Sequence, residues 1–264
     1  MVLIDEELCI GCGDCAADCP SKSICMTAGK AAYTAPCMEC GHCVAVCPVQ
    51  AVSISGYDMQ DVEEYDPGTF CINPENMLHA IKFRRSIRNF KPDKIEEEKV
   101  RNILQAGRYT ATAKNGQATT FVFVQDNMEE FRNLVWEILP KLIDIFKKST
   151  PIYAKIFRHF YERRRENPCE DNLLYNTPAF LVIATDNHSM DGGLAAANME
   201  NMAVSEGLGV LFSGYMMRVI SESPALRNWL EVGEKAIAGC MLIGYPAVTY
   251  RRTAPRLEGN IIRK

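Results

Sequence analysis

The sequence CIGCGDCAADCP at residues 9–20 is matched, 28 residues later, by CMECGHCVAVCP at residues 37–48. In both stretches the four cysteines are separated by two, two and three residues, and a proline follows the last cysteine. Because every member of the first set recurs at the same interval, the N-terminal part of the chain is an internal duplication. The repeats use eight of the 12 cysteines: Cys9, Cys12, Cys15, Cys19, Cys37, Cys40, Cys43 and Cys47.

The pattern C-x2-C-x2-C-x3-C-P is typical of bacterial iron–sulfur sequences, in which the fourth cysteine ligates the cluster of the other repeat. Three thiolates in a short loop reach three irons of a cubane, and the fourth iron needs a ligand from elsewhere. We therefore predict two [4Fe-4S] clusters. One is assigned to Cys9, Cys12, Cys15 and Cys47, and the other to Cys37, Cys40, Cys43 and Cys19.

Zinc is the main alternative, since CxxC spacing also suits tetrahedral zinc sites. Zinc does not require three evenly spaced cysteines followed by C-P, which favours iron–sulfur clusters. The beginning of the chain, MVLIDEELC, shows no signal peptide, so we expect a cytoplasmic protein, in which disulfides are disfavoured. Cys25 lies outside both sets and is expected to be a small core residue.

The distribution of charge and cysteine predicts two domains. Residues 1–50 contain six acidic and two basic side chains, whereas acids and bases balance in the rest of the chain. We predict a 2[4Fe-4S] domain over residues 1–56, a polar, turn-rich linker over 57–74 and a larger domain over 75–264. A domain of fifty-odd residues buries little apolar surface, so the clusters should form part of its core.

The larger domain alternates between helical and strand patterns. Buried strands are predicted at 119–125, 179–185, 209–212 and 236–244. A first helix begins at Asn73-Pro74-Glu75, which supply a cap, an N1 proline and an early acid. Further helices are predicted at 95–107, 128–139, 151–165, 191–207 and 223–230. This mixture predicts an α+β domain around one central mixed sheet.

Four polar segments of the larger domain lie at the ends of these predicted elements. They are RRSIRNF (84–90), TAKNGQ (112–117), EGLGVLFSG (206–214) and GYPAVTYRRTAPR (244–256). Taken singly, each has an ordinary structural explanation. Arginines at a helix end are common on solvated surfaces, and Asn115 beside Gly116 suits a simple turn.

In this order and spacing, over about residues 75–257, the segments resemble the nitroreductase family of FMN flavoproteins. Residues 1–56 are similar to a bacterial-type ferredoxin with two [4Fe-4S] clusters. The nitroreductase resemblance implies an α+β homodimer with FMN bound in the dimer interface. The chain departs from the family at Ala118-Thr119, where Pro-Trp is typical, so the wall of the pocket should differ.

The same resemblance implies which residues contact FMN. The phosphate, ribityl chain and pyrimidine edge would be contacted by Arg84, Arg85, Ser86 and Arg88. The flavin ring would be contacted by Asn115 and Gln117, and its reactive edge by Ser213 and Gly214. Either Arg252 or Arg251 would also bind the phosphate. The planar guanidinium group matches a phosphate well, and a cation near the pyrimidine stabilises the charge that develops on reduction. No catalytic side chain is predicted, because solvent or a flavin N–H can deliver the proton.

Together these features predict an FMN-dependent oxidoreductase. Its clusters would take electrons from a low-potential one-electron donor such as ferredoxin, and its small-molecule acceptor would be a nitroaromatic or a quinone. Two alternatives remain: a non-catalytic electron carrier or redox partner, or an FMN enzyme that reduces an activated C=C or carbon–halogen bond.

Other functions are disfavoured by composition. The pI near 5.7 argues against nucleic acid binding, and no apolar run reaches the roughly 18 residues that span a membrane. The sequence has no GxGxxG motif between a predicted strand and a predicted helix, so a built-in NAD(P)H site is not expected. Residues 141–165 carry eight basic and two acidic side chains, which suits either an acidic redox partner or an ordinary exposed helix.

Overall fold

The computed structural model describes residues 1–186 and 188–264, and these form two compact units. The N-terminal unit contains Met1–Ile72 together with Thr112–Gly116, and the larger unit contains Asn73–Ala111 and Gln117–Lys264. The predicted linker therefore groups mostly with the N-terminal unit. The N-terminal unit also includes Thr112–Gly116, five residues of the polar segment TAKNGQ.

The N-terminal unit is built from the two cysteine repeats and two small hairpin-like sheets. Strand β1 (Val2–Ile4) pairs antiparallel with β4 (Val52–Ile54), and β2 (Ile24–Thr27) pairs antiparallel with β3 (Lys30–Tyr33). Each repeat adds one short helix, α1 (Asp14–Asp18) or α2 (His42–Ala45).

The two short helices of this unit begin in the same way. Gly13 precedes α1 with φ 86°, and Gly41 precedes α2 with φ 78°. A residue with a side chain rarely adopts this left-handed conformation, so glycine lets the cysteine loop bend directly into its helix. The duplication seen in the sequence is therefore also a duplication of local backbone structure.

The larger unit has one sheet of four strands in the order β5-β6-β8-β7. The strands are β5 (Thr120–Val124), β6 (Ala179–Thr185), β7 (Gly209–Phe212) and β8 (Ala236–Gly244). Each neighbouring pair is antiparallel. The sheet of these four strands is therefore antiparallel, and the prediction of a mixed sheet is wrong for them; a parallel pairing occurs as an isolated bridge between Ser86 and Val210.

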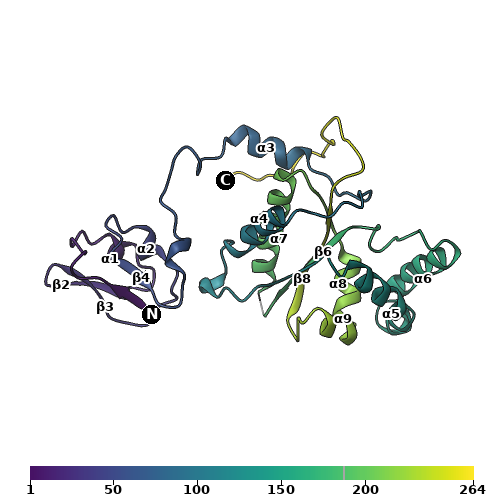
Figure 1. Ribbon diagram of the computed structural model, residues 1–264, viewed down its shortest axis with the longest axis horizontal. Coiled ribbons are helices and arrows are strands. Elements are labelled where there is room, and N and C mark those ends of the chain that lie inside the picture. Colours follow the sequence, from purple (N-terminus) through teal and green to yellow (C-terminus); the bar gives the residue numbers. More distant parts are fainter. Residues whose placement is uncertain (187) are drawn as a thin grey trace. The chain divides into compact units, whose positions relative to one another are not determined.

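Helices cover both faces of this sheet (Figure 1). On one face lie α4 (Glu97–Arg108) and α7 (Ser189–Ser205). The other face carries α5 (Met128–Ser149), α6 (Pro151–Glu166), α8 (Gly214–Ser221) and α9 (Pro224–Trp229). The α+β class predicted from the sequence is confirmed.

Strand β6 is buried along its whole length and separates the two hydrophobic cores. Phe180, Val182 and Ala184 face the core under α5, α6, α8 and α9, and the alternate residues Leu181 and Ile183 face the core under α4 and α7. Side chains alternate across a strand, so a strand between two cores must be apolar on both faces, as AFLVIAT is.

The predicted helices differ from the structure in one range and in one omission. The helix predicted to end at 139 continues through Pro140 to Ser149, because Leu142, Ile143 and Phe146 beyond the proline are buried in the core. Helix α8 had no counterpart among the predictions, because its eight residues directly follow β7 and look like an extension of it. None of the described helices is both long enough and apolar enough to cross a membrane.

Helix α3 (Pro74–Phe83) is capped as predicted, with the Asn73 side chain accepting a hydrogen bond from Asn76 N. All ten of its residues are exposed, which is unusual for an amphipathic helix. Its large apolar side chains Met77, Leu78, Ile81 and Phe83 are 37% to 49% exposed. Within the single chain, this helix therefore has an uncovered apolar face.

Replacing Gly209 with alanine should destabilise the larger unit by about 1–3 kcal/mol, a typical cost of overpacking. A Cβ at this position would lie 2.4 Å from Ile87 Cγ1. Urea unfolding followed by the fluorescence of Trp136 and Trp229, both in the larger unit, measures the change. The control is Gly193→Ala in α7, whose added Cβ meets nothing within 4 Å and should not lower stability. Equal stability of the two variants would contradict the prediction.

Candidate functional site

The structure brings the cysteines of the N-terminal unit together in two groups, each around a small cavity. Cys9, Cys12, Cys15 and Cys47 line the first cavity. Three of these residues come from the first repeat and the fourth comes from the end of the second. These are the four residues assigned to one cluster from the sequence.

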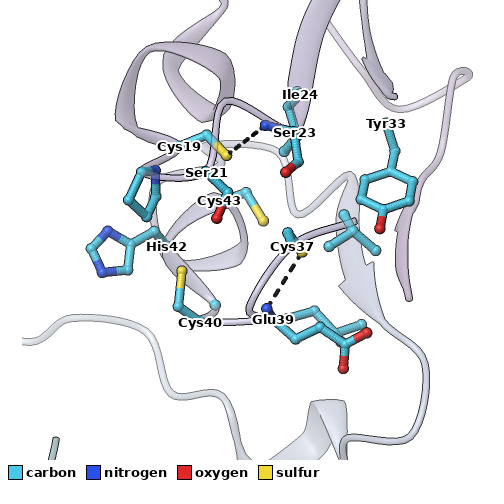
Figure 2. A pocket seen from close by; sticks show the side chains of 14 residues that line it. Cys19, Ser21, Ser23, Ile24, Tyr33, Cys37, Glu39, Cys40, His42 and Cys43 are labelled. Atoms are coloured by element: carbon cyan, nitrogen blue, oxygen red, sulfur yellow. Dashed lines mark hydrogen bonds between the residues drawn. The ribbon is translucent and has the colours of Figure 1, made fainter. Parts of the chain in front are cut away.

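The second cavity is lined by Cys19, Cys37, Cys40 and Cys43 (Figure 2). Here the second repeat supplies three cysteines and the first repeat supplies Cys19. The crossing arises because α1 and α2 pack against each other, so the end of each repeat reaches the loop of the other. The structure thus groups the eight cysteines as the sequence pattern predicts.

Backbone N–H groups point at several of the sulfur atoms. Ser23 N lies 3.3 Å from Cys19 Sγ, and Ala51 N lies 3.2 Å from Cys47 Sγ. Glu39 N donates to Cys37 Sγ at 3.4 Å. Such donors stabilise sulfur that carries negative charge, as in a thiolate bound to iron.

The protonation of the thiols depends on the same surroundings. Backbone N–H groups of Ala31 and Gly11 lower the pKa of Cys9, whereas burial raises the pKa of Cys15 and Cys43. A bound metal deprotonates a coordinating thiol outright. Buried cysteines whose pKa values are raised therefore become ligands only when a strongly charged group occupies the cavity.

Four cysteines around one cavity are the number of thiolates that a [4Fe-4S] cluster needs. Among the residues that the structure describes, no three His, Cys, Asp or Glu side chains are placed to hold one metal ion. The four thiolates around a cubane bind four different irons, so they need not converge on one point.

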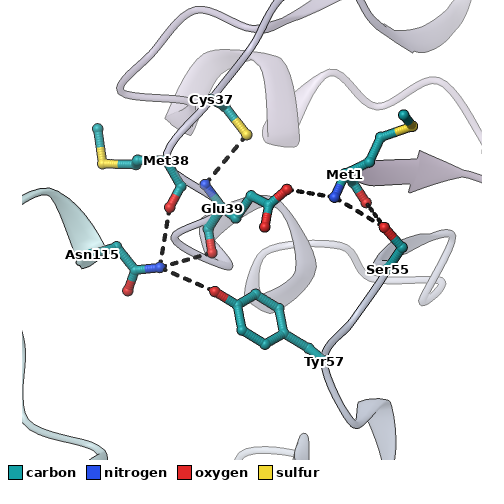
Figure 3. Close-up of polar contacts among 7 residues, drawn as sticks. All are labelled: Met1, Cys37, Met38, Glu39, Ser55, Tyr57 and Asn115. Atoms are coloured by element: carbon teal, nitrogen blue, oxygen red, sulfur yellow. Dashed lines mark hydrogen bonds and ion pairs between the residues drawn. The ribbon is translucent and has the colours of Figure 1, made fainter. Parts of the chain in front are cut away.

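Asn115 belongs to the N-terminal unit, where it contacts the loop between two cluster cysteines (Figure 3). Its Nδ2 donates to Met38 O at 3.1 Å and to Glu39 O at 3.0 Å, and lies 3.4 Å from Tyr57 Oη. Glu39 also pairs with the amino group of Met1. The amide nitrogen of Asn115 is therefore used within this unit, and its role toward FMN stays a prediction.

In the larger unit, backbone hydrogen bonds hold the arginine segment between two other polar segments. Ile87 N donates to Val210 O at 3.0 Å, beside the end of β7. Ala247 N donates to Asn89 O, and Lys91 N donates to Tyr245 O, both at 2.8 Å. Three of the four segments selected from the sequence therefore lie side by side.

Arg84 and Arg85 differ in how their guanidinium groups are paired. Arg84 Nε lies 3.1 Å from Glu200 Oε2, and this carboxylate on α7 is 7% exposed. Burial raises the pKa of Glu200, and the neighbouring Arg84 opposes this effect. Arg85 Nη1 donates to Arg84 O at 2.8 Å, while its Nη2 is buried and has no hydrogen-bond partner among the described residues.

A buried guanidinium N–H without an acceptor is costly. The unpaired Nη2 of Arg85 therefore fits an anion such as a phosphate at this place. Glu200 was missed in the sequence, where its only signal is a lone acid on a helix face that is otherwise buried and apolar.

Arg88, Ser213 and Gly214 line a larger cavity with a volume of about 600 Å³. Ser213 Oγ caps α8 by accepting from Met216 N at 3.2 Å, and Ser213 N donates to Cys240 O. Gly214, the first residue of α8, lies at the wall of the cavity. Arg88 and the start of α8 together suit the polar edge of a ligand that accepts electrons.

The remaining predicted residues lie at the surface of the larger unit. Ser86 and Gln117 are exposed, and Gln117 has φ 47°. Arg251 and Arg252 are exposed in the chain that follows β8.

Two other expectations from the sequence can be compared with the structure. Cys25 is exposed on β2, so the prediction of a core residue is wrong; the alternation of the strand points Ile24 into the core instead. In the basic segment, Lys147 pairs with Asp144 and Arg163 with Glu170. Part of its positive charge is therefore neutralised locally.

Two family models match the chain in consecutive regions. A model of the 4Fe-4S dicluster domain matches residues 1–48, which places an iron–sulfur domain before an oxidoreductase fold. The model described as the nitroreductase family matches residues 81–245, more than half of the chain. The chain belongs to the nitroreductase family, and the resemblance predicted from its polar segments is confirmed.

Several solved structures share the fold at low sequence identity. A nitroreductase with bound FMN from Bacteroides fragilis NCTC 9343 has a TM-score of 0.56 and 21% identity, over 73% of this chain and 98% of that one. A nitroreductase with bound FMN from Desulfitobacterium hafniense DCB-2 has a TM-score of 0.54 and 19% identity, over 70% of this chain and 96% of that one. An FMN-dependent nitroreductase from Clostridium difficile R20291 has a TM-score of 0.52 and 18% identity, over 72% of this chain and 100% of that one. A comparison with curated proteins finds no match.

Replacing Cys43 with serine should remove the second cluster, lowering the iron content from about eight to about four per chain. Cys43 is buried in the second cavity, whereas Cys25 is exposed and lines neither cavity. Iron and acid-labile sulfide, measured after anaerobic purification, report the loss. Cys25→Ser is the control and should retain both clusters; equal iron contents in the two variants would refute the assignment.

The variant Asn115→Leu separates two roles for this side chain. Loss of the amide removes the hydrogen bonds to Met38 and Glu39, so the second cluster should be extracted severalfold faster by an iron chelator. Bleaching of the cluster absorbance measures the rate, and FMN content is measured in the same sample. Unchanged cluster loss combined with lower FMN content would instead support contact with the flavin.

Proposed function

We propose that the chain is an iron–sulfur flavoprotein oxidoreductase. It would use two [4Fe-4S] clusters and FMN to carry electrons from a low-potential one-electron donor to an electron-poor organic acceptor, such as a nitroaromatic or a quinone. The observation that carries this proposal is the occurrence, in one nitroreductase-family chain, of two four-cysteine cavities and an arginine-lined cavity.

Each group has a distinct part in this proposal. When bound, the clusters would transfer single electrons, and FMN would convert single-electron input into two-electron reduction. Arg84 and Arg85 would bind the FMN phosphate, since Arg85 has an unpaired buried donor, and either Arg251 or Arg252 would join them. Ser86 would meet the ribityl chain and Arg88 the pyrimidine edge.

The residues around the larger cavity would orient the reaction without supplying a proton. Ser213 and Gly214 would present the first turn of α8 to the reactive edge of the flavin, and Gln117 would lie near the ring. Solvent reaches the open cavity and can deliver protons, so no acidic side chain is required. This open cavity favours turnover over the alternative of a closed, non-catalytic electron carrier.

A homodimer is part of the proposal. The uncovered apolar residues of α3 are joined by Leu257, Ile261 and Ile262 near the C-terminus, which are 77% to 96% exposed. Large exposed apolar side chains in such numbers favour an interface with a second chain. Size-exclusion chromatography with light scattering should give twice the chain mass of 29.6 kDa. The cytoplasmic location stays a prediction.

The central experiment is anaerobic purification with iron, sulfide and flavin assays. We expect about eight irons per chain, from two cubanes, and one FMN. Reduced ferredoxin should then reduce the clusters and the flavin, and a nitroaromatic or a quinone should reoxidise both. A colourless protein with two zinc ions would overturn the proposal.

Replacing Arg88 with alanine should weaken FMN binding by about 10-fold or more, as expected for loss of a charge-assisted hydrogen bond. Iron content should not change, because Arg88 lies in the other unit. Flavin fluorescence titration of the apoprotein gives the dissociation constant. Arg101→Ala, at an exposed position of α4, is the matched control. Unchanged affinity in the Arg88 variant would remove this residue from the site.

A further inference from the structure

The cavity that contains Arg88 has a second cation, Arg218 of α8, that the flavin assignment does not use. We propose that Arg218 binds the anionic group of an aromatic electron acceptor, so that the enzyme prefers acceptors that carry a carboxylate or a similar anion. This inference rests on the proposed function and specifies its substrate class.

The position of Arg218 is fixed by an aromatic side chain. Its Cζ lies 3.9 Å from the centroid of the Tyr153 ring. The Tyr153 ring in turn packs against the Tyr215 ring, with 6.4 Å between the two ring centroids. A guanidinium group stacked on a ring keeps its N–H donors at its edges, where they can form a bidentate pair with a carboxylate. The stacking therefore orders the group without using its donors.

The local charge favours an anion. Among the described residues, Arg218 forms no ion pair with a carboxylate, in contrast to Arg84, which is paired with Glu200. Two arginines and one acidic residue, Glu222, line the cavity. The excess of positive charge in a concave site raises the local concentration of anionic ligands.

The walls favour a planar aromatic molecule. Tyr153, Tyr175 and Tyr215 line the cavity, and Phe212 at the end of β7 lines it with 44% of its surface exposed. Phe212 directly precedes Ser213, so an aromatic ring stacked on it would lie close to the edge assigned to the flavin. The cavity volume of about 600 Å³ lies within the usual range of about 300–1,000 Å³ for a small-molecule site.

The FMN phosphate is the other anion that Arg218 could bind. Two observations place the phosphate elsewhere. Arg85 has the unpaired buried donor, and the described residues that line the cavity include Arg88 but neither Arg84 nor Arg85. Arg218 is therefore left for a second ligand.

The test compares 4-nitrobenzoate with the neutral analogue 4-nitrobenzyl alcohol, using the holoenzyme with dithionite as reductant. Two electrons from dithionite and two protons from solvent convert the nitro group to a nitroso group and water. The measured quantity is the ratio of kcat/KM for the two acceptors. In Arg218→Met this ratio should fall about 10- to 100-fold, because a charge-assisted bidentate contact is lost while the apolar stem remains.

Two further variants sharpen the comparison. Arg218→Lys keeps the charge without the planar fork and should give an intermediate ratio. Arg158→Met removes one charge from an exposed position of α6 that does not line the cavity, and should leave the ratio unchanged. An equal fall in Arg158→Met would show a general effect of charge and overturn the inference.

Binding is also measured without turnover, by equilibrium titration of the oxidised protein with 4-nitrobenzoate. Weaker binding in Arg218→Met supports the anion site, even if no acceptor is reduced. The inference would be overturned if Arg218→Met changed neither the kcat/KM ratio nor the affinity for 4-nitrobenzoate, or if it lowered only the affinity for FMN. Either result would leave the proposed function intact. A protein that retains neither FMN nor iron would instead contradict the proposed function.

Discussion

The close approach of Ile87 to Gly209 is the contact on which the polar groups of the larger unit depend. The backbone of Ile87 pairs with Val210, and its side chain occupies the space that a Cβ at position 209 would need. This pairing holds the segment Arg84–Arg88 beside β7, whose end leads into Ser213 and α8. Backbone hydrogen bonds therefore position the arginines without using their guanidinium groups.

The arginines around this segment are held by different partners, and this divides their roles. A buried carboxylate holds Arg84, an aromatic ring holds Arg218, and Arg85 keeps an unpaired donor. An arginine that is already ordered loses less conformational entropy when it binds a ligand. Three cations of the same type can thus be tuned for a phosphate and for an acceptor by their neighbours alone.

In the N-terminal unit the corresponding constraint is the burial of thiols. Burial raises the pKa of Cys15 and Cys43, so both cysteines favour the neutral form until iron binds. Cys9, Cys15 and Cys43 also belong to the small hydrophobic core of this unit. Cluster binding and folding are therefore coupled, because the same residues contribute to both.

Much of the fold and of the cluster sites was predictable because the relevant signals are local and periodic. Equal cysteine spacing in two repeats predicts which four residues surround each cavity. Continuous apolar runs such as AFLVIAT predict buried strands. Predictions failed where a local pattern competes with packing: Pro140 does not end its helix because the core continues beyond it, and Cys25 faces outward because the strand alternates.

The sequence by itself determined the duplication, the two sets of cysteines, the family resemblance and the identity of the arginines. Only the tertiary structure decided which arginines have free donors, that Glu200 pairs with Arg84, that Arg218 stacks on Tyr153, and that Asn115 contacts the Cys37–Cys40 loop. The physical reason is distance along the chain. These pairs are separated by 65 to more than 100 residues or bridge separate elements, and no local pattern encodes contacts that arise only when the chain is packed.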